Sequence, residues 1–219
     1  MKKYFVVFGL TVICLMTAIV LSACDSTMIG REYKRISDYR YASYRYECAD
    51  YTLDIFCGVR ETPYSLDGKS AGNKTKYTVF VVRPVSDVYG GAEELPLDAE
   101  IDGKEYSVKL TLHPFRDSYS AEIPDAPTEG TEELTANLNG AEVTATNAPH
   151  SVDGEYALAL AMETLGETAE KGEIYLRLTE NTVTAESGWY WFVSFNDGEN
   201  VSSVLIDAEG GEVKAVRNS

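Results

Sequence analysis

The stretch DGEYALALAMETLGETAEK, residues 153–171, divides the chain into two regions with different hydrophobic periodicity. It is rich in Ala, Leu, Met and Glu, which are good helix formers. Leu158, Met162 and Leu165 recur at the three- and four-residue spacing of a buried helix face. Asp153 stands at the start, where a negative charge suits the helix dipole. The pattern predicts one amphipathic helix, which needs a sheet to cover its apolar side.

The region that follows this helix has the composition of short strands. Turn residues that include glycine separate the last three runs, as in antiparallel hairpins. One helix on an antiparallel meander is therefore the expected architecture, an α+β domain. The predicted strands cover residues 173–178, 189–195, 201–207 and 212–216.

The region before the helix, from residue 36 to about 149, lacks a long helical pattern. The run 107–112 alternates apolar and polar residues, which indicates a half-buried strand. Asp102-Gly103 and Asn139-Gly140 are hairpin turn signals. Short strands with frequent turns favour an all-β sandwich, and an immunoglobulin-like topology is the expectation.

The N-terminus has the anatomy of a secretory signal, with a basic start and a long apolar run. Leu21-Ser22-Ala23-Cys24 resembles the lipobox of bacterial lipoproteins. That resemblance implies that Cys24 becomes the lipidated first residue, held at the extracytoplasmic face of the cell membrane. The alternative is an uncleaved N-terminal anchor, because the apolar run approaches the length of a membrane span. The predicted parts are a signal peptide (1–23), lipidated cysteine and tether (24–35), β-sandwich domain (36–149) and α+β domain (150–219).

The chain is strongly acidic, with 35 Asp and Glu against 19 Lys and Arg and a net charge of −16. Loss of Lys2 and Lys3 with the signal would make the mature chain more acidic still. Binding to nucleic acid or to anionic lipid needs clustered basic residues. Nucleic acid is therefore not a predicted partner, and the membrane is reached through the lipid on Cys24.

Cys48 and Cys57 are the two cysteines outside the signal and the lipobox. Export to a compartment where disulfides persist makes a bond between them possible. Two buried thiols are the equally weighted alternative.

The stretch REYKRISDYRYASYRY, residues 31–46, carries five basic residues and five tyrosines in an otherwise acidic chain. Interleaved arginines and tyrosines could bind an anionic glycan, a wall polymer or lipid headgroups through charge and ring stacking. The plainer interpretation is a first strand whose tyrosines pack on the sheet and whose arginines meet acidic surface. The candidate interaction residues in this stretch are Tyr39, Arg40, Tyr41 and Arg45.

The C-terminal region resembles the PepSY domain of exported bacterial proteins. The similarity rests on ALALAMETLG (157–166), WYWFVSFNDG (189–198) and IDAEGGEV (206–213), with Gly210 where the family usually has threonine. It implies a regulatory or binding module and, more weakly, a peptidase as partner. In the strand 189–195, Trp189 and Trp191 share one face with the other large apolar residues, and Tyr190 and Phe192 lie on the opposite face. Tyr190 and Phe192 are expected either to pack on the β-sandwich or to form an exposed docking patch.

These patterns favour a membrane-anchored extracytoplasmic lipoprotein that acts as a non-catalytic binding or regulatory module towards a peptidase or envelope protein. The alternatives are a structural or adhesive envelope lipoprotein, and an envelope hydrolase with an unrecognised pair of carboxylates. With only His113 and His150 and no zinc-ligand spacing or nucleotide-binding motif, no cofactor or metal is predicted.

Overall fold

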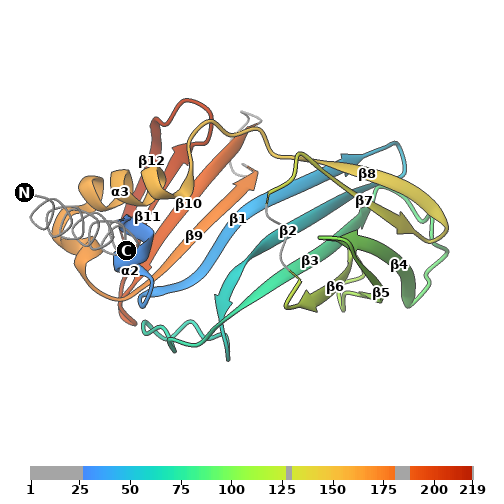
Figure 1. Ribbon diagram of the computed structural model, residues 1–219, viewed down its shortest axis with the longest axis horizontal. Helices are drawn as coiled ribbons and strands as arrows, with labels where there is room; N and C mark the ends of the chain where they lie inside the picture. Colours follow the sequence, from blue (N-terminus) through green and yellow to red (C-terminus); the bar gives the residue numbers. More distant parts are fainter. Residues whose placement is uncertain (1–26, 127–129, 181–187, 219) are drawn as a thin grey trace, which may run out of the picture.

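The computed structural model describes residues 27–126, 130–180 and 188–218. Its strands form one twelve-stranded sheet in the order β12-β11-β10-β9-β1-β2-β3-β6-β5-β4-β7-β8 (Figure 1). The elements are α2 (Met28–Glu32), β1 (Ile36–Glu47), β2 (Tyr51–Glu61), β3 (Lys74–Pro84), β4 (Glu94–Ile101), β5 (Lys104–Leu112), β6 (Tyr119–Pro124), β7 (Glu133–Leu138), β8 (Ala141–Asn147), α3 (Gly154–Leu165), the 3₁₀ helix η2 (Gly166–Glu170), β9 (Glu173–Glu180), β10 (Trp189–Asn196), β11 (Val201–Asp207) and β12 (Val213–Asn218).

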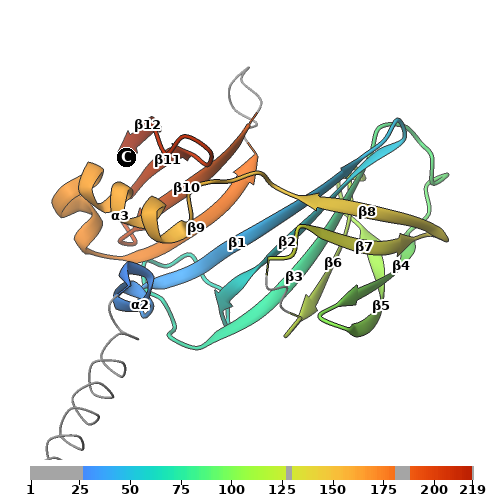
Figure 2. The same ribbon diagram turned by 45° about the horizontal axis from the view of Figure 1, so that its top comes forward.

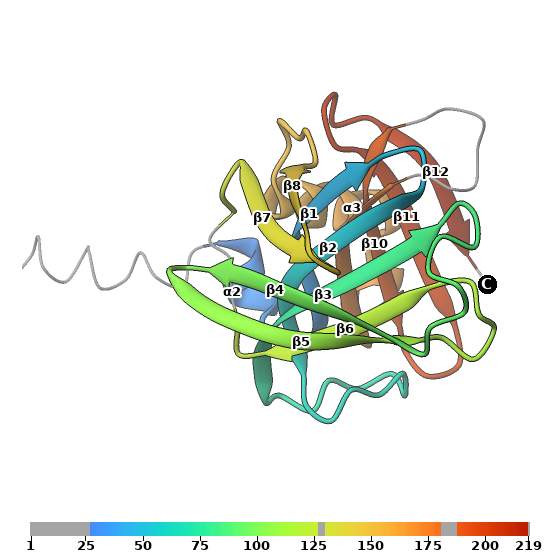
Figure 3. The same ribbon diagram turned by 90° about the vertical axis from the view of Figure 1, so that its right-hand side faces the viewer.

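Strands β1 to β8 close into an antiparallel barrel, seen from its end in Figure 3. Closure comes from the pairing of β1 with β8, in which Tyr44 is opposite Asn147 and Arg45 is opposite Thr146. The expected β-sandwich is therefore wrong. Alternating strands bury one face in a sandwich and in a barrel alike, so periodicity could not separate the two folds.

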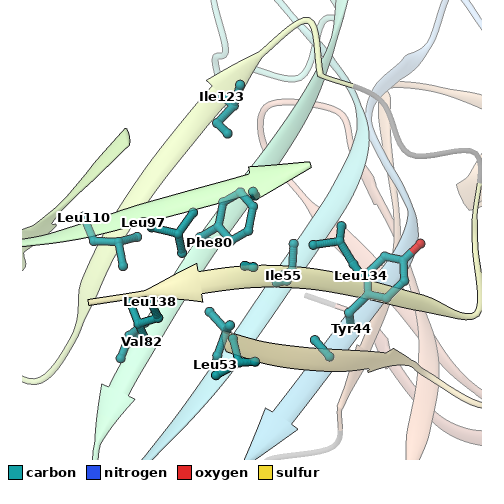
Figure 4. Packing of buried hydrophobic residues seen from close by; sticks show 14 of the residues in the cluster. Tyr44, Leu53, Ile55, Phe80, Val82, Leu97, Leu110, Ile123, Leu134 and Leu138 are labelled. Carbon is teal, nitrogen blue, oxygen red and sulfur yellow. The ribbon is translucent and has the colours of Figure 1, made fainter. Parts of the chain in front are cut away.

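The barrel interior is filled by apolar side chains from all eight strands. Phe80 and Ile55 face residues from the opposite wall, such as Leu97 and Leu138 (Figure 4). The two hairpin turns expected from sequence are confirmed at Asp102-Gly103 and Asn139-Gly140, where both residues of each pair have positive φ.

Strand β1 belongs to the barrel and to the C-terminal strands at once. Its first half, Ile36–Arg40, pairs in parallel with β9, and its second half pairs with β8 on the same edge. A register shift between Arg40 and Ala42 separates the two halves. The expected division into two domains, a sandwich and an α+β domain, is therefore wrong, because one sheet passes through β1 without interruption.

Helix α3 and strands β9 to β12 lie close to the positions that the sequence predicts. Asp153 caps α3 by accepting a hydrogen bond from the backbone N–H of Tyr156. The helix covers one face of β9, β10 and β11 (Figure 1). Leu158 packs there in a second core with Trp191. These elements nevertheless extend the barrel sheet and do not form a fold of their own.

Residues 28–32, which the sequence predicts as part of a tether, form the short helix α2 at the start of β1 (Figure 2). The carboxylate of Glu155 on α3 accepts hydrogen bonds from the backbone N–H groups of Met28 and Ile29. Helix α2 is therefore held against α3 by these contacts. None of the helices in the described ranges has the length and apolar composition needed to span a bilayer.

Candidate functional site

The sheet has two faces with different surroundings. One face meets α3 in the C-terminal half and the barrel core in the other half. We call the opposite face the outer face, and the pairing register identifies which side chains lie on it. One cross-strand row on it runs through Tyr77, Gly58, Arg40, Arg177 and Phe192. Two arginines from strands far apart in sequence are therefore direct neighbours on this face.

A pocket of about 430 Å³ opens where β9 separates from β1. Most of its lining belongs to the outer face, whereas Glu180 and Trp189 belong by register to the face that α3 covers. At this fork the hydroxyl of Ser43 on β1 donates a hydrogen bond of 2.9 Å to the carbonyl of Leu178 on β9. The pocket unites residues from β1, β2 and β3 with the end of β9 and the start of β10. Its lining consists of Arg45, Glu47, Thr52, Asp54, Phe56, Arg83, Thr179, Glu180 and Trp189.

Asp54 organises the charged side of this pocket. Its side chain is 1% exposed, and it accepts from Nε of Arg45 at 2.8 Å and from Nη1 of Arg83. Arg45 also pairs with Glu180. Burial by itself would lower the pKa of Arg45, and its hydrogen bonds to Glu180 and Asp54 outweigh that effect and raise the pKa. The contacts to Asp54 hold the guanidinium groups of Arg45 and Arg83 in fixed orientations.

Aromatic rings form the rest of the pocket. The guanidinium of Arg45 lies 5.5 Å from the ring centre of Trp189, and that of Arg40 lies 4.0 Å from the ring centre of Phe56. Such stacking keeps each cation beside an apolar surface. The pocket therefore offers ring faces together with charged and hydroxyl groups, the usual combination in sites that orient a polar ligand.

A second polar cluster on the outer face fixes the seam between β1 and β9. Asp38 on β1 accepts from the hydroxyl of Tyr77 at 2.8 Å and from Nε of Arg177 at 2.6 Å. The Tyr77 ring reaches Asp38 across Gly58 of β2, where a Cβ atom would lie 2.8 Å from the Tyr77 hydroxyl oxygen. Burial and the neighbouring Asp38 raise the pKa of Tyr77, so the hydroxyl remains a donor. This cluster positions Arg40 and Arg177 beside each other.

The connection between β2 and β3 is tied to the C-terminal strands by a buried carboxylate. Glu173 at the start of β9 accepts from the backbone N–H of Gly68 at 2.9 Å and from the amide of Asn196 at 2.8 Å. Gly68 packs so tightly on the turn at Gly198 that a Cβ atom would lie 2.3 Å from its nitrogen. Barrel and C-terminal strands are thus fastened at this end as well.

The structure separates the residues that the sequence nominated for interaction. Arg40, Arg45, Tyr190 and Phe192 lie on the outer face, and Arg45 lines the pocket. Tyr190 is only 4% exposed, and Phe192 is half-buried. Tyr39 and Tyr41 lie away from the pocket: Tyr39 packs in the core under α3 and Tyr41 against the barrel core.

Cys48 and Cys57 do not form a disulfide. Cys57 is buried in the barrel core, whereas the thiol of Cys48 donates to the carbonyl of Tyr51 in the turn before β2. About half of β2 lies between them, which exceeds the span of a disulfide. Of the two alternatives, a disulfide or two buried thiols, the structure has thiols, and Cys48 is only partly buried. Cys24 lies outside the described residues.

Sequence reasoning missed Asp54, Phe56 and Arg83, which complete the pocket. The sequence did contain one signal, because Asp54 interrupts a run of apolar strand residues in YTLDIFCGV, residues 51–59. A carboxylate at such a position needs a cationic partner when it is buried. The partners, Arg45 and Arg83, come from both neighbouring strands and could be named only from the strand order.

No protein-family model, curated protein or solved structure matches the chain. Within the described ranges, no group of three or more His, Cys, Asp or Glu side chains is placed to hold a metal ion.

Proposed function

We propose that this protein is a lipid-anchored extracytoplasmic binding protein, and that the pocket at Arg45, Asp54, Arg83 and Trp189 holds its ligand without transforming it. The anchor rests on the lipobox resemblance around Cys24. The observation that carries the binding role is the arrangement around Asp54. One buried carboxylate holds two arginines, while an aromatic ring and two threonine hydroxyls complete the same pocket.

This arrangement favours binding because its polar groups are already oriented. Asp54 restricts the side-chain freedom of both arginines, so less entropy is lost when a ligand binds. The half-exposed side chain of Arg83 retains N–H groups that face solvent. Trp189 is half-buried at the edge of the pocket and presents apolar ring surface to a ligand. A saccharide unit suits this combination, because it carries hydroxyl groups around an apolar ring face.

The binding role is tested by electrophoresis of the native protein in gels that contain a soluble polysaccharide. We expect dextran or polygalacturonate to retard the wild-type protein, and Trp189→Ala to abolish the retardation. Tyr156→Ala removes an exposed aromatic ring from α3 that does not line the pocket, and it should migrate as the wild type does. Unchanged migration of the wild-type protein in every polymer would overturn the binding role.

The anchor is tested separately in cells. We expect Cys24→Ser to abolish acyl labelling and to release the protein from the membrane fraction. Membrane attachment and acyl labelling that persist in this variant would overturn the anchor.

A further inference from the structure

Arg40 differs from the other arginines near the pocket in its partners. Arg45 and Arg83 pair with Asp54, Arg177 pairs with Asp38, and Arg60 pairs with Glu122. Within the described ranges, no carboxylate lies within ion-pair distance of Arg40. Its Nε atom is buried and has no hydrogen-bond partner there. The Arg40 side chain is hydrogen-bonded to the Tyr77 hydroxyl, so its charge has a neutral partner in place of a carboxylate.

The position of Arg40 connects it to the pocket. Its guanidinium lies 4.0 Å from the ring centre of Phe56, and Phe56 lines the pocket. Along β2, Asp54, Phe56 and Gly58 point to the outer face in turn, and Arg40 pairs with Gly58. Asp54 and Gly58 are four residues apart, which corresponds to about 13 Å along the strand. A ligand in the pocket that extends along β2 therefore reaches Arg40.

The charges around Arg40 favour an anionic group at this end of the site. The chain as a whole carries −16, so an anionic polymer is repelled by most of its surface. Arg40 and its cross-strand neighbour Arg177 place two guanidinium groups together, with Asp38 as the carboxylate bound to Arg177. Three acidic side chains line the pocket: Asp54 is paired with Arg45 and Arg83, and Glu47 and Glu180 lie beside Arg45 in the direction away from Arg40.

We propose that Arg40 is the anion subsite of the pocket and that the ligand is an acidic saccharide polymer. A sugar ring packs on Trp189, and an anionic group further along the polymer accepts from the guanidinium of Arg40. The proposal rests on the proposed function, since it names the ligand class of the same pocket.

Three polymers in native gels separate the parts of this proposal. Polygalacturonate supplies sugar rings with carboxylates, dextran supplies rings without charge, and polyphosphate supplies charge without rings. We expect polygalacturonate to bind most tightly. Arg40→Gln should weaken polygalacturonate binding about tenfold and leave dextran binding unchanged, because it removes one charged hydrogen-bond donor.

Arg60→Gln is the matched control, because it removes the same charge from the same face of the sheet. Arg60 pairs with Glu122 and lies further along β2 from the pocket than Gly58, the residue opposite Arg40. It should therefore lower polygalacturonate affinity much less than Arg40→Gln. Arg40→Lys retains the charge and should bind polygalacturonate more tightly than Arg40→Gln. Thermal unfolding of each variant shows whether it is folded.

Each contrary outcome has a distinct meaning. Equal binding of dextran and polygalacturonate would overturn the anion subsite, and so would wild-type affinity in a folded Arg40→Gln variant. Neither outcome would contradict the pocket as a saccharide-binding site. Polyphosphate that binds as tightly as polygalacturonate would overturn the saccharide assignment. Failure of all three polymers to bind the wild-type protein would overturn the proposed function as well.

Discussion

Arg177 on β9 donates from Nε to Oδ2 of Asp38 on β1 across 2.6 Å, and this contact joins the C-terminal strands to the barrel. The carboxylate of Asp38 is almost fully buried, and its other oxygen accepts from Tyr77 on β3. Three strands are thereby linked through one side chain. Since β1 and β9 meet in parallel through only a few residues, this contact stabilises the seam and sets the position of Arg40.

The first prediction concerns the stability of this seam. Arg177→Met leaves Asp38 buried without its cation, which should lower the free energy of unfolding by about 3 kcal/mol. Asp38→Asn retains the side-chain shape, and the more exposed Arg177 can still reach water. This variant should therefore lower the free energy of unfolding by only about 1–2 kcal/mol. Urea unfolding of both variants and of the double variant measures the coupling.

The exposed pair of Arg60 and Glu122 provides the comparison for that experiment. It lies on the same face, and Arg60→Gln should cost less than about 1 kcal/mol because surface pairs contribute little. If Arg177→Met and Arg60→Gln lowered the free energy of unfolding equally, the buried contact would contribute no more to stability than the exposed pair.

The second prediction concerns Gly58, whose lack of a side chain lets Tyr77 cross β2. A Cβ atom there would lie 2.5 Å from the carbonyl oxygen of Tyr39 and 2.8 Å from the Tyr77 hydroxyl oxygen. Gly58→Ala should therefore displace Tyr77 from Asp38 and destabilise the protein by about 1–3 kcal/mol. Thermal or urea unfolding provides the measurement.

Gly210 is the matched glycine for this comparison. A Cβ atom there would meet only the Asp207 side chain, at an ordinary 3.5 Å. Gly210→Thr should change the free energy of unfolding by less than about 0.5 kcal/mol. If Gly58→Ala were as harmless as Gly210→Thr, the close packing over Gly58 would not matter.

The third prediction concerns stability at alkaline pH. Burial, together with the nearby Asp153 and Glu155, raises the pKa of Tyr39 to about 12. The pKa of an unfolded tyrosine is about 10, so the folded state holds the proton more tightly. The resulting stability is fully present below about pH 10 and is lost as the pH rises towards 12.

Tyr39→Phe has no hydroxyl to ionise and should lose less stability across this interval. The measurement is the free energy of unfolding in urea at pH 9 and at pH 11. Burial also raises the pKa of Tyr89 to about 12, so the variant should keep part of the loss. Identical losses in the variant and the wild-type protein would contradict the assignment to Tyr39.

Local structure could be predicted from the sequence because its signals are local. The Ala- and Leu-rich stretch specified α3, and Asp102-Gly103 and Asn139-Gly140 specified two hairpin turns. Each depends on propensity or on backbone conformations within a few residues. Arg40 and Arg45 could be nominated for the same reason, since their unusual composition is visible in a short window.

The lipid anchor and the resemblance to PepSY domains remain predictions. Both rest on short motifs, and Cys24 lies outside the described residues.

The barrel, the continuous sheet and the pocket were decided by tertiary structure. Periodicity tells which face of a strand is buried, but it does not tell which strand lies beside it. Ile36 pairs with Ile174 and Tyr44 with Asn147, so contacts across more than 100 residues of chain replace the expected two domains with one sheet. Asp54 likewise acquires its arginines from two neighbouring strands. The sequence by itself determined where helices, strands and turns form, and the long-range pairing of β1 determined what they build.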